Sequence, residues 1–293
     1  MTTHVATEIA SQPECWRTAM ALEPAGLPKP GERVAVVGCG TSLYVAQAYA
    51  VLREAAGLGE TDAFAASEYP AARRYDRLLA ITRSGTTTEV LAALARARAA
   101  GIPTTAITGD LATPITGAAD TIVDLSFADE QSVVQTRFAT TTLVLLRSSL
   151  GLTPADLPEQ AADAVAGELP AAALAARQFT FLGTGWTIGL ANEAALKLRE
   201  AAGAWTESYP AMEYRHGPIS VSAPGGVVWF FGEAPEGLLE QIAATGAEVW
   251  LGGIDPLADL VRAQRVAVAL AEAQGLDPDQ PRNLTRSIIL ATP

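Results

Sequence analysis

The stretch VAVVGCGTSLYVA at residues 34–46 decides the fold, because a β-branched apolar run leads through a glycine turn into a helical pattern. The same order returns in LLAITRSGTTTEVLAAL at residues 78–94 and in FTFLGTG at residues 179–185. Further short apolar runs, TTAIT, TIVDL, GGVVWFFG and EVWLGG, alternate with alanine-rich amphipathic stretches. This alternation is typical of βαβ units and predicts an α/β fold with parallel sheets flanked by helices.

Two series of such units follow one another along the chain. The segment LGLTPADLPEQ at residues 150–160 has the prolines and polar residues of a linker that leads into a helix. We therefore expect one domain over 1–152, which includes a lead-in helix, and a second over 153–293. The two series agree in sequence only at VVGCGTS (36–42) and FLGTGWT (181–187). Helices are expected to start at about Ser42, Thr86, Val134, Ile188, Glu236 and Pro256.

Composition excludes several classes of protein. The chain has 293 residues, 49% of them hydrophobic and 18% charged, which is typical of a globular protein. Its formal net charge of −12, without a basic segment, argues against binding to nucleic acid. No apolar run is long enough to cross a membrane, and the N-terminus lacks the features of a secretory signal. Cys15 and Cys39 do not have the spacing of a metal site, so we expect a cytoplasmic protein with free thiols.

Two of the strand ends carry the features of a phosphate site. Gly38 and Gly40 let the backbone approach an anion closely, and Thr41 and Ser42 place hydroxyls at the start of the next helix. A second hydroxyl-rich helix start contains Thr82, Arg83, Ser84, Thr86, Thr87 and Thr88 around Gly85. Ordinary helix capping would explain either loop alone, and one glycine-rich turn could also hold a nucleotide. Because neither GxGxxG nor a P-loop is present, we favour a small phosphorylated ligand.

The stretch EAALKLREAAGAWTESYPAMEYRHGP at residues 193–218 contains the candidate catalytic groups. Glu193, Lys197 and Glu200 are spaced by four and three residues, so a helix places all three on one face. His216 follows in a turn marked by glycine and proline, where an imidazole could exchange protons near neutral pH. Spacing alone is equally consistent with a solvated helix face followed by a surface histidine.

Five ordered motifs resemble the sugar isomerase (SIS) family, and most closely the isomerase half of glucosamine-6-phosphate synthase and its stand-alone relatives. They are VVGCGTS, ITRSGTTTEVLAAL, EAALKLREA, ESYPAMEYRHGPI and DPDQPRNLTRSI, and the opening TEIASQP is similar to the lead-in segment of that group. The resemblance implies two flavodoxin-like SIS domains. It also implies a homodimer whose active sites are shared between subunits.

The resemblance assigns roles to individual residues. It places Gly40, Thr41 and Ser42 in the first phosphate loop, and Thr82, Arg83, Ser84 and Thr87 in the second. Val133 and Gln135 match positions that contact the sugar. Glu200 matches the carboxylate that moves a proton between C1 and C2, with Lys197 and Glu193 beside it on the helix. His216 matches the residue that opens the sugar ring in the partner's site.

The chain departs from the synthase at three points. The synthase has a lysine near its C-terminus that forms an imine with the ketose, whereas this chain has Arg286, whose guanidinium stays protonated. We expect Arg286 to hold a carbonyl or phosphate oxygen instead. Arg83 replaces a glutamine and adds a charge to the phosphate loop. No glutamine-hydrolysing domain is expected, because the sequence starts at the isomerase lead-in.

These features together predict an aldose–ketose isomerase for a phosphorylated sugar, with isomerising deamination if the substrate is an aminosugar phosphate. Neither a metal nor a cofactor is expected, since Lys197, Arg286 and backbone N–H groups can stabilise an oxyanion. A phosphosugar-sensing regulator is an alternative, although it would need a DNA-binding domain. A lyase remains open as well, because elimination also starts with proton abstraction beside a carbonyl.

Overall fold

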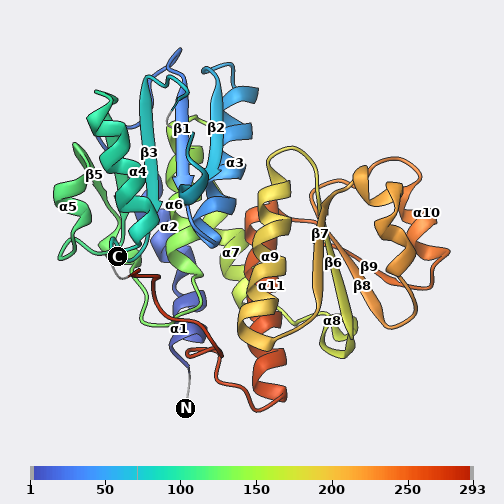
Figure 1. Ribbon diagram of the computed structural model, residues 1–293. Helices are drawn as coiled ribbons and strands as arrows, with labels where there is room; N and C mark the ends of the chain where they lie inside the picture. Colours follow the sequence, from blue (N-terminus) through green and yellow to red (C-terminus); the bar gives the residue numbers. More distant parts are fainter. Residues whose placement is uncertain (1–2, 71, 291–293) are drawn as a thin grey trace. The chain divides into compact units, whose positions relative to one another are not determined.

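The computed structural model describes residues 3–70 and 72–290, and within them the chain divides into two compact units (Figure 1). The N-terminal sheet unit comprises Cys15–Glu130, Arg137–Thr153 and the residues from Thr285 onward. The C-terminal sheet unit comprises the residues before Cys15, Gln131–Thr136 and Pro154–Leu284. The chain passes between the units near the expected boundary at 152/153. It also does so at Cys15, on both sides of Gln131–Thr136, and at Thr285.

The N-terminal sheet unit is built on a parallel sheet with the strand order β2-β1-β3-β4-β5, which is the flavodoxin-like order. Its strands are β1 (Val34–Gly38), β2 (Thr61–Ala65), β3 (Arg77–Thr82), β4 (Thr104–Thr108) and β5 (Thr121–Asp124). Its helices include α3 (Thr41–Ala55), α4 (Thr88–Ala99), α5 (Ile115–Ala118) and α6 (Arg137–Ser149). The α/β architecture expected from the sequence is confirmed.

The apolar runs of the sequence form the centre of this sheet. Every residue of β1 and β4 is buried, as expected for strands with helices on both faces. On one face, Ala35, Val37, Leu78 and Ala80 pack against the apolar side of α4. Helix α3 packs against β1, β2 and α6. The alanine-rich helices therefore lie close to the sheet and fix where each loop leaves it.

The C-terminal sheet unit repeats the same strand order in the sheet β7-β6-β8-β9. Its strands are β6 (Gln178–Gly183), β7 (Thr206–Pro210), β8 (Gly226–Phe231) and β9 (Glu248–Leu251). Its helices include α1 (His4–Ala10), α7 (Leu157–Ala166), α8 (Ala171–Ala175), α9 (Thr187–Ala202), α10 (Leu238–Ala243) and α11 (Pro256–Ala273). A further helix, α2 (Gln12–Met20), follows α1.

Tertiary contacts shift one expected helix start. The helix expected from about Val134 begins at Arg137, because the N–H groups of Gln131 and Ser132 donate to the Glu8 carboxylate. Those bonds hold the preceding segment outside the helix. Helix α10 likewise begins at Leu238, near the expected start at Glu236. Among residues 3–70 and 72–290, no helix is both long and apolar enough to cross a membrane.

Candidate active site

The first glycine turn brings helix α3 close to the end of β1. A Cβ at Gly38 would lie 2.6 Å from the backbone carbon of Ser42, so only glycine fits this approach. Gly40 adopts a φ of 55°, which favours glycine, and the helix begins at the next residue. Thr41 and Ser42 are both 3% exposed. Within the described residues nothing hydrogen-bonds the Ser42 hydroxyl, which leaves it available for a ligand.

The second hydroxyl-rich loop leaves the sheet beside the first. Val37 of β1 pairs with Ala80 of β3 in a parallel register, so the loops after Gly38 and Thr82 emerge at the same edge. The Ser84 Oγ accepts bonds from the Thr86 N–H and hydroxyl at 3.3 and 3.1 Å. It also lies 3.5 Å from the Thr87 Oγ1. The loops therefore place several hydroxyls at the N-terminal ends of α3 and α4, where an anion is favoured.

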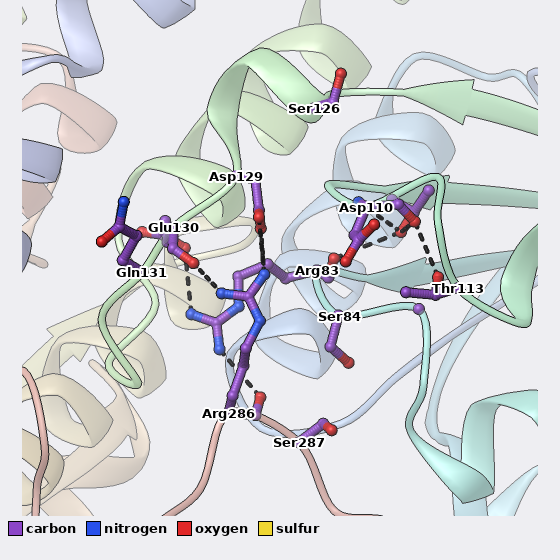
Figure 2. Close-up of polar contacts among 12 residues, drawn as sticks. Arg83, Ser84, Asp110, Thr113, Ser126, Asp129, Glu130, Gln131, Arg286 and Ser287 are labelled. Carbon is purple, nitrogen blue, oxygen red and sulfur yellow. Dashed lines mark hydrogen bonds and ion pairs between the residues drawn. The ribbon is translucent and has the colours of Figure 1, made fainter.

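Arg83 does not present a free charge at this edge. Its side chain is 1% exposed, and its guanidinium lies 3.7 Å from the Glu130 carboxylate, which is fully buried (Figure 2). The same guanidinium donates to the backbone carbonyl of Arg286 at 3.0 Å. A buried charge requires such compensation. The positive charge that the sequence led us to expect in the phosphate loop is thus balanced by Glu130.

Arg286 lies in the same unit, and its guanidinium is held by a carboxylate. It donates to both oxygens of Asp129, at 2.6 and 2.8 Å, and to the backbone carbonyl of Glu130 (Figure 2). Nη2 makes both bonds to Asp129 while Nη1 bonds the Glu130 carbonyl, so the fixed fork of the guanidinium reaches two neighbouring residues at once. Arg286 therefore anchors the C-terminal segment, and its expected contact with an oxygen of the substrate stays a prediction.

The equivalent glycine turn of the C-terminal sheet unit is closed by its own hydrogen bonds. The Thr187 hydroxyl accepts from the Thr184 N–H at 2.8 Å and donates to the Phe231 carbonyl at 2.7 Å. Gly183 precedes Thr187 by four residues, as Gly38 precedes Ser42, and a Cβ there would clash with the Thr187 carbonyl at 2.3 Å. In this unit the glycine turn thus lets the start of α9 pack closely against the end of β6.

Helix α9 brings Glu193, Lys197 and Glu200 together on one face, as their spacing predicts. The Lys197 Nζ lies 2.5 Å from the Glu200 Oε2 and 3.5 Å from the Glu193 Oε1. Lys197 and Glu193 are buried at 1% and 2% exposure, whereas the Glu200 side chain is 20% exposed. Glu200 is therefore the member of the cluster that solvent or a ligand reaches.

Glu200 lines a cavity of about 680 Å³ within the C-terminal sheet unit. The wall is formed by the last turn of α9 and by the segment after α11, with Arg199, Asp277, Gln280, Arg282 and Asn283 among the lining residues. A polar cavity of this size accommodates a small hydrophilic molecule. Two carboxylates, two guanidinium groups and three side-chain amides belong to the lining residues.

Val133 and Gln135 lie in the segment before α6, which is fixed by the Glu8 carboxylate and by the Asp279 backbone carbonyl. Glu8 accepts from the Gln131 and Ser132 N–H groups, at 2.5 and 3.3 Å, and also from the Ser132 hydroxyl. The Val133 N–H donates to the Asp279 carbonyl at 3.0 Å.

Gln135 Oε1 is buried and accepts no hydrogen bond from any residue that the structure describes. A buried acceptor without a partner is costly. A sugar hydroxyl would satisfy it.

Asp279 also connects this segment to the N-terminal helix. Its carboxylate accepts from the N–H groups of His4 and Val5 at 2.8 and 2.7 Å, at the start of α1. Glu8 and Asp279 were not identified from the sequence. They lie in the motifs TEIASQP and DPDQPRN. Their hydrogen-bond partners are more than 120 residues away in the sequence, so no local pattern indicates the contacts.

His216 is the last residue of a short 3-10 helix, Glu213–His216, and its side chain is exposed. The following Gly217 has a φ of 142°, consistent with the expected turn. The neighbouring Tyr214 is buried and its hydroxyl lies 2.5 Å from the Ser222 Oγ. This core contact fixes the short helix while leaving the imidazole in solvent.

Across residues 3–70 and 72–290, no group of three or more metal-binding side chains comes together. Cys39 lies within the first glycine turn, between Gly38 and Gly40, and burial raises the pKa of its thiol. A thiol with a raised pKa is a poor nucleophile near neutral pH.

A protein-family model matches the region that contains both hydroxyl-rich loops. The matched family is described as the SIS domain and covers residues 29–150. Both phosphate loops expected from the sequence, and the β1–α3 and β3–α4 units that carry them, lie inside this matched region.

Comparison with curated proteins extends the similarity beyond residues 29–150. The chain is 27% identical over 296 residues to glutamine–fructose-6-phosphate aminotransferase (isomerizing) of Sulfurisphaera tokodaii, covering 89% of this chain and 50% of the relative. The chain thus spans about half the length of the curated relatives it matches.

Solved structures share the fold over nearly the whole chain. Glucosamine-6-phosphate deaminase of Thermotoga maritima has a TM-score of 0.83 at 23% identity, covering 98% of this chain and all of that one. Tagatose-6-phosphate ketose/aldose isomerase of Escherichia coli has a TM-score of 0.74 at 19% identity, covering 99% and 96%. At these identities the likeness concerns the fold.

Proposed function

We propose that the chain is an aldose–ketose isomerase for a phosphorylated sugar, with Glu200 as the group that moves the proton between C1 and C2. The observation that carries this proposal is the contact of Glu200 with the buried Lys197 at the wall of a polar cavity. Its curated relatives at 26–29% identity include isomerizing aminotransferases of fructose 6-phosphate, which supports the substrate class.

The arrangement of α9 suits reversible proton transfer. Glu200 is accessible, so its carboxylate can approach a C–H beside a carbonyl and later return the proton to the adjacent carbon. Lys197 is buried between two acids, and its positive charge stabilises the negative charge that develops on the enediol oxygens. Glu193 balances the lysine when the substrate displaces Glu200 from it.

The phosphate group is assigned to the SIS domain loops. The free Ser42 hydroxyl and the hydroxyls of Ser84 and Thr87 provide donors at two helix N-termini. The C-terminal sheet unit has the same strand order, and we propose that it is a second SIS-like domain. Because Thr187 is bonded internally there, that domain contributes catalytic groups and no phosphate loop.

We further propose a homodimer in which His216 acts in the partner's site as the group that opens the sugar ring. The exposed imidazole at the end of a short, anchored helix supports this assignment. If the sugar bears an amino group at C2, isomerisation yields an imine that hydrolyses to ammonia and a ketose phosphate. An aminohexose 6-phosphate is therefore the first substrate to test.

The decisive experiment is a screen of hexose, aminohexose and pentose phosphates, with separate assays for ketose phosphate and for ammonia. Ketose phosphate with an intact carbon chain supports the isomerase, and accompanying ammonia supports the deaminase. Loss of a substituent without movement of the carbonyl group from C1 to C2 would establish a lyase instead. Binding of the phosphates without any turnover would favour a sensor.

A further inference from the structure

The C-terminal segment 286–290 lies along the second hydroxyl-rich loop of the SIS domain. The Thr88 N–H donates to the Ile288 carbonyl at 3.2 Å, and the Leu290 N–H donates to the Thr88 Oγ1 at 2.9 Å. The Ser287 Oγ lies 2.8 Å from the Thr86 Oγ1. Residues separated by about 200 positions in the sequence thus share one edge of the N-terminal sheet unit.

Polar contacts hold this tail, which is defined here as residues 286–290. Ile288, Ile289 and Leu290 are 50%, 70% and 55% exposed, so burial of their side chains contributes little. The charged contact is that of Arg286 Nη2 with both oxygens of Asp129, and the bond from Arg83 to the Arg286 carbonyl supports it (Figure 2). Attachment of the tail therefore depends mainly on the Arg286–Asp129 pair.

The tail adds a hydroxyl to the phosphate loop. Ser84 Oγ contacts Thr86 Oγ1, and Thr86 Oγ1 contacts Ser287 Oγ, at 3.1 and 2.8 Å. Each of these hydroxyls can rotate to donate to an anion. The tail carbonyl of Ile288 already occupies the Thr88 N–H at the start of α4. Binding of an anion at this loop consequently depends more on hydroxyl donors than binding at a helix N-terminus whose N–H groups are all free.

Charge balance at the loop strengthens this dependence. Arg83 faces Glu130, and Arg286 faces Asp129, so the two guanidinium groups are each compensated by a carboxylate. Carboxylates of the protein therefore largely compensate both positive charges. A bound phosphate must obtain its stabilisation from neutral donors, and each donor lost has a large effect.

We propose that Ser287 binds the phosphate of the substrate together with Ser84 and Thr87, and that the Arg286–Asp129 pair is the latch that positions it. This inference rests on the proposed function, because it takes the SIS domain loops as the phosphate site. It assigns to the tail a role in binding that is separate from imine chemistry, and it makes Arg286 a positioning residue.

The test uses inorganic phosphate as the probe, since it requires no knowledge of the sugar, and isothermal calorimetry on the full chain. Ser287→Ala is expected to weaken phosphate binding about tenfold, which is the effect of losing one hydrogen bond to a charged group. Ser149→Ala is the matched control, because its hydroxyl bonds only to the Leu146 carbonyl of its own helix. It should bind phosphate as the parent does.

Two variants separate this inference from the proposed function. Ser84→Ala must weaken binding if the loop holds phosphate at all. If Ser84→Ala binds phosphate more weakly and Ser287→Ala binds it within twofold of the parent, the role of the tail is overturned. The assignment of phosphate to the loop is then retained. No effect of Ser84→Ala, or no phosphate binding by the parent, would overturn both.

The latch has its own test in a double-variant cycle. Arg286→Gln and Asp129→Asn should each weaken phosphate binding, and neither should weaken it further when combined with Ser287→Ala. Trypsin cleaves after Arg286, and this cleavage should be faster in Asp129→Asn than in the parent, with cleavage after the exposed Arg282 as the internal reference. Additive losses, or unchanged cleavage after Arg286, would show that the pair does not position Ser287.

Discussion

Lys197 lies 2.5 Å from Glu200 and 3.5 Å from Glu193, so one buried ammonium contacts an accessible and an inaccessible carboxylate. The two acids thus differ in environment although they share a helix face. Glu193 is enclosed and serves to balance the lysine charge. Glu200 is exposed enough to reach a ligand, which supports the proposal that it transfers the proton while its neighbours provide electrostatic support.

The first prediction concerns Glu200 as the base. Glu200→Gln keeps the shape of the side chain but removes the proton acceptor, so we expect kcat to fall at least about 100-fold with the fold intact. Steady-state kinetics and circular dichroism provide the measurements. Glu240→Gln, at an exposed position of α10, is the matched control and should keep full activity. Turnover of Glu200→Gln within threefold of the parent would contradict the assignment.

The second prediction concerns stability. Lys197→Met removes the ammonium group that lies 3.5 Å from the buried Glu193 carboxylate, and we expect this to cost about 3–5 kcal/mol of unfolding free energy. The double variant Glu193→Gln with Lys197→Met should recover part of that loss, because a neutral amide replaces the stranded charge. Urea unfolding measures both. Equal stability of the single and double variants would show that Glu193 does not depend on Lys197.

Most of the fold could be predicted from the sequence because its central strands are continuous apolar runs. The runs VAVVG, RLLAIT and TTAIT are β1, β3 and β4, and nearly all their residues are buried. One edge strand of each sheet was missed, whereas the opposite edges, β5 and β9, were identified as the runs TIVDL and EVWLGG. TDAFA in β2 and TESYP in β7 are only partly buried, so polar residues are tolerated there and no apolar run marks them.

The candidate site was predictable where it is local and not where it depends on distant partners. The face of α9 follows from spacing of three and four residues within one helix. The compensation of Arg83 by Glu130 could not be read from the sequence, because burial and tertiary pairing determine it. The same holds for Arg286, whose partner Asp129 lies 157 positions away.

The third prediction contrasts the two glycine turns. Ser42→Ala removes a hydroxyl that has no partner among the described residues, so stability should be unchanged while inorganic phosphate binds more weakly. Thr187→Val leaves the Thr184 N–H and the Phe231 carbonyl unpaired and should cost about 1–3 kcal/mol of unfolding free energy. Thermal unfolding and calorimetry distinguish these effects. Phosphate binding that depends equally on both residues would contradict the division of roles.

The fourth prediction tests the proposed sharing of His216 between subunits. Glu200→Gln and His216→Ala chains are each expected to be inactive on a cyclic substrate. After subunit exchange, about half of the dimers are hybrids with one intact site, so activity should recover to about a quarter of the parent value. Mass spectrometry verifies the exchange. No recovery despite exchange would mean that each chain completes its own site.

The last prediction concerns Arg286, whose guanidinium is held by both oxygens of Asp129. A guanidinium remains protonated and forms no imine, so borohydride added during turnover of a ketose phosphate should trap no sugar on the chain. Arg286→Lys introduces an amine whose contact with Asp129 is less extensive than that of the guanidinium. If the tail reaches the sugar carbonyl, this lysine can form an imine that borohydride traps. Mass spectrometry of tryptic peptides locates any adduct. An adduct on the parent chain would contradict the prediction, and its position, with Lys197 the first to inspect, would identify the amine that forms the imine.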